Sequence, residues 1–335
     1  MVLVTGASGF VGLNLLHVLV SDRRPVVGLA DRPLPDLAAA SLAHLGPVPV
    51  VDQVDVRDTV AVAEAVGRHQ PGVVIHAAAV TAGPDRERTD ARTVVDVNVG
   101  GTQSVLDACS QAGVKRLVHV SSGAVYGSAS FGPEPLDETT LVAPASPPPS
   151  YYGITKLAAE QLARRHGQLH DLDVVAARLS AVFGPWEYPS GVRDFMSPML
   201  QMVRAARDGT PIRLLVDQPR NWVYAPDGAR ALVGLADLEG PEHDCYNVCP
   251  EATTTAAAFL DRLARSQPDL DHALVDRPEA ATIDSDTEPR LVRAAVSSRR
   301  LARELGPVWG EALWTAAEQA FDDYIRWAKA NPSWL

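Results

Sequence analysis

The chain begins with a short apolar run that leads directly into a turn rich in glycine. Residues 2–4 are apolar, and Gly6, Gly9 and Gly12 follow at three-residue intervals. An apolar pattern at helical spacing then covers residues 11–19, so the segment predicts a strand, a tight turn and a helix. In such a unit Gly6 makes the turn, Gly9 lets a phosphate approach the backbone, and Gly12 lets the helix lie close to the strand.

A second apolar run, residues 26–30, ends at Asp31. This spacing suits a carboxylate that accepts hydrogen bonds from the hydroxyls of an adenosine ribose. The first helix would offer free N–H groups and positive dipole charge to a pyrophosphate, so we expect a bound dinucleotide. Asp31 favours NAD because it would repel a 2′-phosphate, whereas the neighbouring Arg32 could pair with that phosphate in NADP; NAD is the expectation.

Composition restricts the classes to which the chain can belong. Of its 335 residues 46% are hydrophobic, which is typical of a globular protein. No apolar run reaches the roughly 18 residues that span a membrane, and the first strand leaves no room for a signal peptide. A net charge of −11 without a basic run argues against nucleic acid as a partner. The three cysteines, Cys109, Cys245 and Cys249, are too few for a disulfide framework or a zinc site, so we expect a reducing cytoplasm and no metal.

Strands and helices alternate through the first half of the chain. We expect strands over 48–56, 73–76, 117–120 and 174–178, and helices over 58–69, 99–112 and 152–165. This alternation predicts an α/β fold, a doubly wound parallel sheet of the Rossmann type that binds its ligand at the C-terminal ends of the strands. The proline-rich stretch 127–150 is predicted as a loop, which either covers a site or only connects two elements.

The regular alternation loosens beyond residue 180. We expect an irregular segment over 186–198, helices over 199–208 and 311–329, and strands over 212–215 and 246–248. The predicted organisation is therefore an NAD-binding domain over 1–178 and a smaller, mainly substrate-binding lobe over 179–335. The lobe is expected to be interleaved with the last strands and helices of the first domain.

Tyr152 and Lys156 lie four residues apart at the start of a predicted helix, so their side chains share one face. A lysine cation about 4 Å away stabilises a phenolate by about 4 kcal/mol at an effective dielectric constant of about 20, which suits a phenol acting as a base. Ser122 follows the strand at 117–120. Its hydroxyl would reach the substrate oxygen with which Tyr152 exchanges a proton.

With these residues in order, the chain resembles the extended short-chain dehydrogenase/reductases of the NAD-dependent epimerase/dehydratase type over nearly its whole length. The matching segments are 5–12, Asp31, Asp55 with Val56, 76–79, 98–102, 121–127, 152–156 and 178–185, with weaker matches at 220–224 and 246–248.

The resemblance implies a role for individual residues. Tyr152 would be the general acid/base, Lys156 would assist it and hold the nicotinamide ribose, and Ser122 would polarise the substrate oxygen. The expected cofactor contacts are Gly6, Ser8, Gly9, Phe10, Val11, Gly12, Asp31, Arg32, Asp55, Val56, Ala77, Ala78, Ala79, Asn98, Tyr152 and Lys156, with Asn98 acting mainly as a support. The expected substrate contacts are Thr81, Ser122, Gly123 and Arg220, although Arg220 could equally be a surface arginine.

Three departures from the family pattern bear on the chemistry. Gly123 and Ala124 stand where family dehydratases commonly carry Asp-Glu, so dehydration of a nucleotide sugar is not expected. Ala181 replaces an asparagine that is common near the diphosphate in sugar-nucleotide members, and Cys249 replaces a glycine. The sequence therefore does not decide whether the chain binds a nucleotide diphosphate.

Three functions remain. The first is an NAD-dependent oxidoreductase that moves a hydride at a carbinol carbon of a sugar-like or small hydroxylated substrate. The second is an epimerase of a sugar or nucleotide sugar that retains its NAD, and the third is an NAD-sensing regulator without activity. The resemblance also implies a homodimer through helices near 100–112 and 152–166, for which Val105, Leu106, Ile154, Leu157 and Leu162 could serve, unless they belong to the monomer core.

Overall fold

The computed structural model describes residues 1–47, 49–140, 148–284, 292–309 and 313–335, without the side chains of 307–309. A seven-stranded sheet forms its centre, and every strand pairs with its neighbours in parallel. From one edge to the other the strands are β10 (Cys245–Val248), β6 (Asp173–Leu179), β5 (Arg116–Ser122), β4 (Val73–His76), β1 (Val2–Thr5), β2 (Val26–Ala30) and β3 (Val50–Gln53). The expected doubly wound α/β fold is confirmed.

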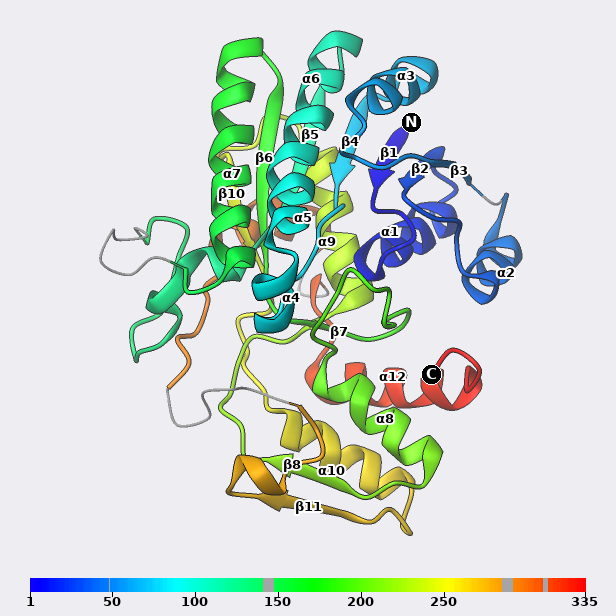
Figure 1. The fold of residues 1–335 in the computed structure, drawn as a ribbon, viewed down its shortest axis with the longest axis vertical. Helices are drawn as coiled ribbons and strands as arrows, with labels where there is room; N and C mark the ends of the chain where they lie inside the picture. Colours follow the sequence, from blue (N-terminus) through cyan, green and yellow to red (C-terminus); the bar gives the residue numbers. More distant parts are fainter. Residues whose placement is uncertain (48, 141–147, 285–291, 310–312) are drawn as a thin grey trace.

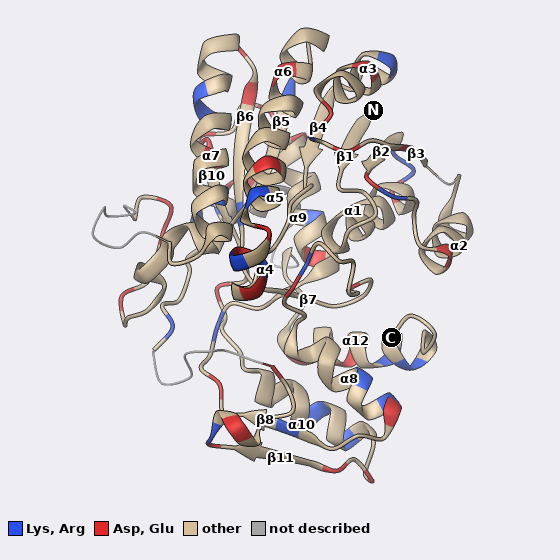
Figure 2. Ribbon diagram, viewed as in Figure 1, with Lys and Arg blue, Asp and Glu red and all other residues tan. Residues whose placement is uncertain are grey.

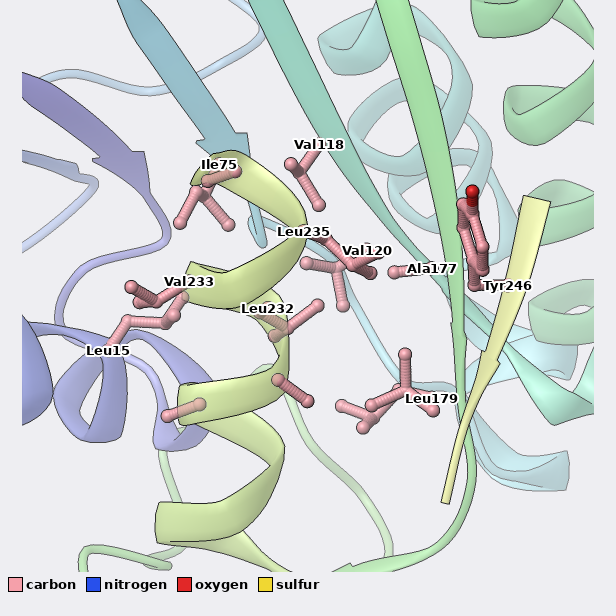
Figure 3. Close-up of a cluster of buried hydrophobic side chains, with 14 of the residues drawn as sticks. Leu15, Ile75, Val118, Val120, Ala177, Leu179, Leu232, Val233, Leu235 and Tyr246 are labelled. Atoms are coloured by element: carbon pink, nitrogen blue, oxygen red, sulfur yellow. The ribbon is translucent and has the colours of Figure 1, made fainter. Parts of the chain in front are cut away.

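Helices cover both faces of this sheet (Figure 1). One face carries α1 (Phe10–Ser21), α9 (Ala225–Asp237) and α11 (Arg299–Trp309), and the other carries α3 (Thr59–His69), α6 (Thr102–Ala112) and α7 (Tyr151–His170). Because side chains alternate along a strand, Leu3 packs toward the second group of helices whereas Val4 packs toward the first. Figure 3 shows Leu232 and Leu235 of α9 on the side of that helix that faces the strands.

A smaller lobe lies beyond the C-terminal ends of the strands (Figure 1). It contains α8 (Pro198–Asp208), α10 (Ala256–Ser266), α12 (Ala317–Ala330) and the parallel pair β8 (Ile212–Leu215) with β11 (His272–Val275). These elements share a second core, in which Phe183, Phe259 and Phe321 are fully buried. The two-stranded pair β7 (Val182–Phe183) and β9 (Val223–Tyr224) joins the lobe to the sheet.

The remaining elements are short. They are α2 (Asp36–Leu45), α4 (Pro84–Thr89), α5 (Ala91–Val95), the π-turn η1 (Asp96–Gly101), and the 3₁₀ segments η2 (Gly123–Ser130) and η3 (Pro278–Ala280). Acidic and basic residues are interspersed over both lobes (Figure 2). Within the described residues, no helix combines the length and apolar character needed to cross a bilayer.

Several predicted boundaries were wrong. The strand expected over 48–56 is only β3, and Asp55 and Val56 follow it as a turn, because Val56 packs against Gly101 instead of extending the sheet; residue 48 lies outside the described residues. The helix expected over 311–329 is α12, which begins only at Ala317; residues 311 and 312 lie outside the described residues. Part of the predicted loop 127–150 belongs to η2, and 141–147 lie outside the described part.

Candidate active site

A cavity of about 440 Å³ lies between the C-terminal ends of the strands and the smaller lobe. Most of the residues predicted for the site line it. They are Gly6, Gly9, Phe10, Val11, Gly12, Ala77, Ala79, Thr81, Ser122, Gly123, Tyr152, Lys156 and Arg220. The fold therefore brings the glycine turn, the tyrosine and lysine of α7 and the serine that ends β5 to one wall.

The glycine turn has the geometry that a pyrophosphate requires. Gly6 has φ +66°, and a Cβ there would lie 2.8 Å from backbone atoms of Ala78. A Cβ on Gly12 would lie 2.0 Å from the carbonyl oxygen of Gly6, so only glycine allows α1 to begin so close to the strand. Gly9 precedes α1 without a side-chain cap, which leaves N–H groups of the first turn open to an anion. These residues fit the pyrophosphate of NAD.

The carboxylate expected at the adenosine end lies where it was predicted, directly after β2. Arg32 donates to both oxygens of Asp31, at 3.1 Å and 3.2 Å from Nε and at 2.6 Å from Nη2. Its other guanidinium nitrogen, Nη1, donates to the carbonyl of Ser190 in the smaller lobe. Arg32 is therefore engaged by two partners that a 2′-phosphate would have to replace, whereas Asp31 suits the two ribose hydroxyls of NAD.

Seven of the predicted cofactor residues do not line the cavity. They are Asp31 and Arg32, which follow β2, and Ser8, Asp55, Val56, Ala78 and Asn98. Hydrogen bonds from the Arg57 side chain hold the pKa of Asp55 below its usual value. Asn98 is 1% exposed, donates 3.0 Å hydrogen bonds to Val80 O and Thr155 Oγ1, and accepts from Val80 N. It thus ties the segment after β4 to α7.

Tyr152 and Lys156 sit in the first two turns of α7. Ser150 caps this helix by accepting a hydrogen bond from Gly153 N at 3.1 Å. Lys156 is 4% exposed, and its Nζ donates to the carbonyl oxygen of Val120 at 2.5 Å. Burial lowers the pKa of Lys156 to about 8, against the opposing effect of the nearby Glu160 carboxylate.

Ser122 ends β5 and faces the same cavity as Tyr152 and Lys156. Its hydroxyl accepts a 3.1 Å hydrogen bond from Ala124 N, so that Ser122 caps η2, and this bond fixes the direction of the serine side chain. The oxygen retains its own proton as a donor toward a substrate oxygen. A phenol, a buried ammonium and a hydroxyl on one wall can together exchange a proton with a substrate hydroxyl.

Sequence reasoning missed several residues of the wall. Arg193, Phe195 and Ser190 come from the irregular segment after β7, and Arg293 comes from a stretch without a motif. No periodic pattern marks these positions, so the sequence did not indicate that they belong to the site. The buried residues Glu160 and Arg178 were also missed as partners, although Arg178 lies within the segment 178–185.

The charged side chains described at the cavity are all cationic, and the three departures from the family pattern add no acid to it. Gly123, Ala124 and Ala181 all line the cavity, and they bring neither an acid nor an amide to it. Among the described residues, no aspartate or glutamate lines this cavity, and no cluster of His, Cys, Asp or Glu could hold a metal ion. Its charged side chains are cationic: Lys156, Arg193, Arg220 and Arg293.

Comparison with known proteins agrees with this geometry. A sequence model described as "NAD dependent epimerase/dehydratase family" matches residues 2–249. The dTDP-glucose 4,6-dehydratase of Streptomyces griseus is 31% identical and is matched over 91% of this chain and 88% of its own. The enzyme of the same name from Neisseria meningitidis serogroup B is 27% identical over 99% of this chain and 94% of its own.

Solved structures share the fold. MoeE5, determined in complex with UDP-glucuronic acid and NAD, superposes with a TM-score of 0.75 at 26% identity and covers 98% of this chain and 99% of its own. The sequence match extends over more than half of the chain. The chain belongs to the NAD-dependent epimerase/dehydratase family and is an enzyme of that family with NAD as its cofactor.

Proposed function

We propose that the chain oxidises a ring hydroxyl of a nucleotide-activated sugar, with Tyr152 as the acid/base. The observation that carries this proposal is the shared cavity wall of Tyr152, Lys156, Ser122 and the glycine turn. The nucleotide sugar is supported by the relatives named dTDP-glucose 4,6-dehydratase and by MoeE5, solved with UDP-glucuronic acid and with UDP-glucose. Arg220 lines the cavity, and its guanidinium lies 5.1 Å from the centroid of the Trp222 ring. This arginine would contact the diphosphate.

In this reaction Tyr152 takes the proton of the substrate hydroxyl, and where the keto sugar is reduced again it returns a proton to the carbonyl oxygen. Lys156 stabilises the tyrosinate through its charge and is held in position by the Val120 carbonyl. Ser122 donates a hydrogen bond to the same substrate oxygen and orients it. Bound NAD supplies the chemistry of hydride acceptance and return.

Dehydration is not favoured, although the curated relatives carry that name. Eliminating water from a keto sugar requires a base to remove a carbon-bound proton and an acid to protonate the leaving hydroxyl. Gly123 and Ala124 occupy the positions where family dehydratases commonly have these acids, and no described carboxylate replaces them on the wall. The keto sugar would then be either released, as by a dehydrogenase, or reduced again from its other face, as by an epimerase.

One observation favours the epimerase as the second candidate. The segment after β7 is fastened over the cofactor side of the cavity, because Tyr188 Oη donates to Ser8 O at 2.7 Å and Arg32 bonds to Ser190 O. Such contacts favour a cofactor that stays bound through the cycle. Protein purified without added NAD and then denatured should release the dinucleotide if this second candidate holds, and should release none if the cofactor exchanges as in a dehydrogenase.

The experiment that tests the proposal replaces Tyr152 with Phe and, as a matched control, its exposed neighbour Tyr151 with Phe. Turnover is measured with uridine and thymidine diphosphate hexoses through nicotinamide absorbance and product chromatography. Tyr152→Phe should still bind NADH but lose turnover, whereas Tyr151→Phe should retain it. Unchanged turnover in Tyr152→Phe would remove this residue from the mechanism.

We also propose the division of labour expected from the sequence, with residues 1–178 holding NAD and 179–335 mainly holding substrate. A homodimer through α7 is supported by Ile154 and Leu162, which are 50% and 41% exposed. Val105 and Leu106 of α6 cannot serve it, because they lie fully buried in the monomer core. Light scattering of Leu162→Glu should show a monomer where the unmodified protein is a dimer.

A further inference from the structure

Arg193 and Arg293 are the two cations of the cavity that no expected ligand group accounts for, and the printed contacts of Arg193 define its position. The NAD pyrophosphate has the amides of the glycine turn, and Lys156 is assigned to Tyr152. The nucleotide diphosphate has Arg220 on the wall of both this cavity and the smaller one beside it. Among the described residues, Asp217 and Asp284 line the smaller cavity, whereas no carboxylate lines the larger one, and its cations favour a substrate with an additional negative charge there.

The guanidinium of Arg193 is rigidly held. Its Nη2 lies 2.8 Å from Oε1 of Glu187, whose side chain is 0% exposed, and its Nε donates to Phe195 O at 2.8 Å. Glu187 is itself anchored by the backbone N–H of Ser197 at 2.7 Å. The cation also lies over the Phe10 ring, 5.0 Å from its centroid. An arginine fixed on three sides is pre-organised to bind an anion with the side that remains.

Arg193 is one of the residues that line the cavity. No described residue accepts a hydrogen bond from Nη1 of Arg193, and 24% of the side chain stays exposed. Thr81 lies next to it, because residues 81 and 193 form a β-bridge in which Thr81 N donates to Val192 O at 2.8 Å. Thr81 lines the same cavity. A guanidinium and a hydroxyl side by side can donate to the two oxygens of a carboxylate.

We propose that Arg193, with Thr81, binds a carboxylate on the sugar ring, so that the substrate is a nucleotide-activated uronic acid. This inference rests on the proposed function and narrows it. MoeE5 was solved with UDP-glucuronic acid, so a protein of this fold can bind such a substrate. Its second structure, with UDP-glucose, provides the matched neutral ligand.

The test compares glucuronic acid with glucose, each as its uridine and its thymidine diphosphate, by calorimetric titration of the NAD-loaded protein. The acid should bind at least about tenfold more tightly, as a charge-assisted hydrogen bond implies. Arg193→Met should abolish this preference by lowering the affinity for the acid to that for the neutral sugar. Arg193→Lys should retain part of it, and the exposed Arg92→Met serves as the control.

The outcomes separate the inference from the proposed function. Equal affinity of the unmodified protein for acid and neutral sugar overturns the carboxylate site and leaves the nucleotide-sugar function standing. Absence of binding by every nucleotide sugar overturns both. If Arg193→Met weakens NADH binding but keeps the preference for the acid, the arginine belongs to the cofactor site and the inference is wrong.

Discussion

The Glu160 carboxylate and the Arg178 guanidinium form an enclosed ion pair one helical turn from Lys156. Arg178 Nη2 lies 2.7 Å from Glu160 Oε1, with side-chain exposures of 6% and 0%. Ser121 Oγ donates to the other carboxylate oxygen at 2.6 Å. The pair therefore joins α7 to β5 and β6 next to Ser121 and Lys156, which line the cavity, and the charge of Glu160 acts on the lysine.

The first prediction concerns the pH dependence of turnover. Burial lowers the pKa of Lys156 to about 8, and Glu160 opposes this shift. The lysine loses its charge as pH rises through about 8, so turnover should fall on the alkaline side. Removing the opposing carboxylate in Glu160→Gln should lower the lysine pKa further and move that fall to lower pH. The rate of hydride transfer measured against pH checks this.

A control variant is Glu64→Gln, because Glu64 is exposed on α3 and should leave the profile unchanged. Glu160→Gln also leaves Arg178 buried without its partner, which costs roughly 3–5 kcal/mol. The double variant Glu160→Gln with Arg178→Met removes the unpaired buried charge as well. An alkaline limb at the same pH in either folded variant contradicts the role given to Glu160.

The second prediction concerns stability in acid. Burial and the charge of Lys156 lower the pKa of His76 to about 3 and hold that of His119 well below its ordinary value. The unfolded chain binds these protons near pH 6.5, so between about pH 6.5 and 3 it takes up more protons than the folded chain. The free energy of unfolding should therefore fall with decreasing pH, by up to about 1.4 kcal/mol per pH unit for each histidine.

His119 is the better of the two to replace. Neither of its ring nitrogens has a hydrogen-bond partner among the described residues. His119→Leu should therefore lose no hydrogen bond and should make the decline in acid shallower, as measured by urea unfolding at a series of pH values. The same change at the exposed His44 is the control. An unchanged slope in His119→Leu would show that His119 does not contribute to acid unfolding.

The parallel sheet could be predicted because its strands are short apolar runs. Residues 73–76 of this sheet were predicted with their observed bounds, and so was the strand over 212–215 in the smaller lobe. The strand at 48–56 was overestimated for a tertiary reason. Val54 and Val56 are apolar because they pack with α3 and α6, and the sequence alone does not distinguish that packing from strand pairing.

The site residues, too, fall into those that the sequence could predict and those that it could not. Gly6, Tyr152 and Lys156 belong to local patterns whose spacing has a chemical meaning, and they all line the cavity. Arg193 belongs to an irregular segment, and long-range contacts such as the β-bridge to Thr81 and the stacking on Phe10 bring it to the wall. A residue positioned by a long-range contact leaves no periodic signal in the sequence.

The third prediction concerns cofactor selection. Asp31→Ser removes the carboxylate that accepts three hydrogen bonds from Arg32, which frees two guanidinium nitrogens for a 2′-phosphate. The affinity for NADPH should rise by about tenfold or more and that for NADH should fall, as measured by fluorescence titration. Adding Arg32→Ala should cancel the gain. An unchanged NADPH affinity in Asp31→Ser would mean that Arg32 does not exchange partners.

The fourth prediction separates two glycines of the first turn. A Cβ on Gly12 would lie 2.0 Å from the Gly6 carbonyl oxygen and 2.8 Å from Ala7 Cα, and both are backbone atoms that cannot move aside. A Cβ on Gly9 would meet only the Gly6 oxygen, at 3.2 Å. Gly12→Ala should therefore destabilise the fold by about 3 kcal/mol or more, measured by denaturant unfolding. Gly9→Ala should remain folded and lose NADH affinity, because its methyl group occupies the approach of the phosphate.

The exposed helical Gly67 of α3 is the matched control, since a Cβ there meets no atom within 4 Å. Gly67→Ala should bind NADH normally and gain up to about 1 kcal/mol of stability from the better helix propensity of alanine. If Gly9→Ala binds NADH as tightly as Gly67→Ala does, the phosphate does not approach the backbone at this turn. That result would require a different position for the pyrophosphate in the cavity.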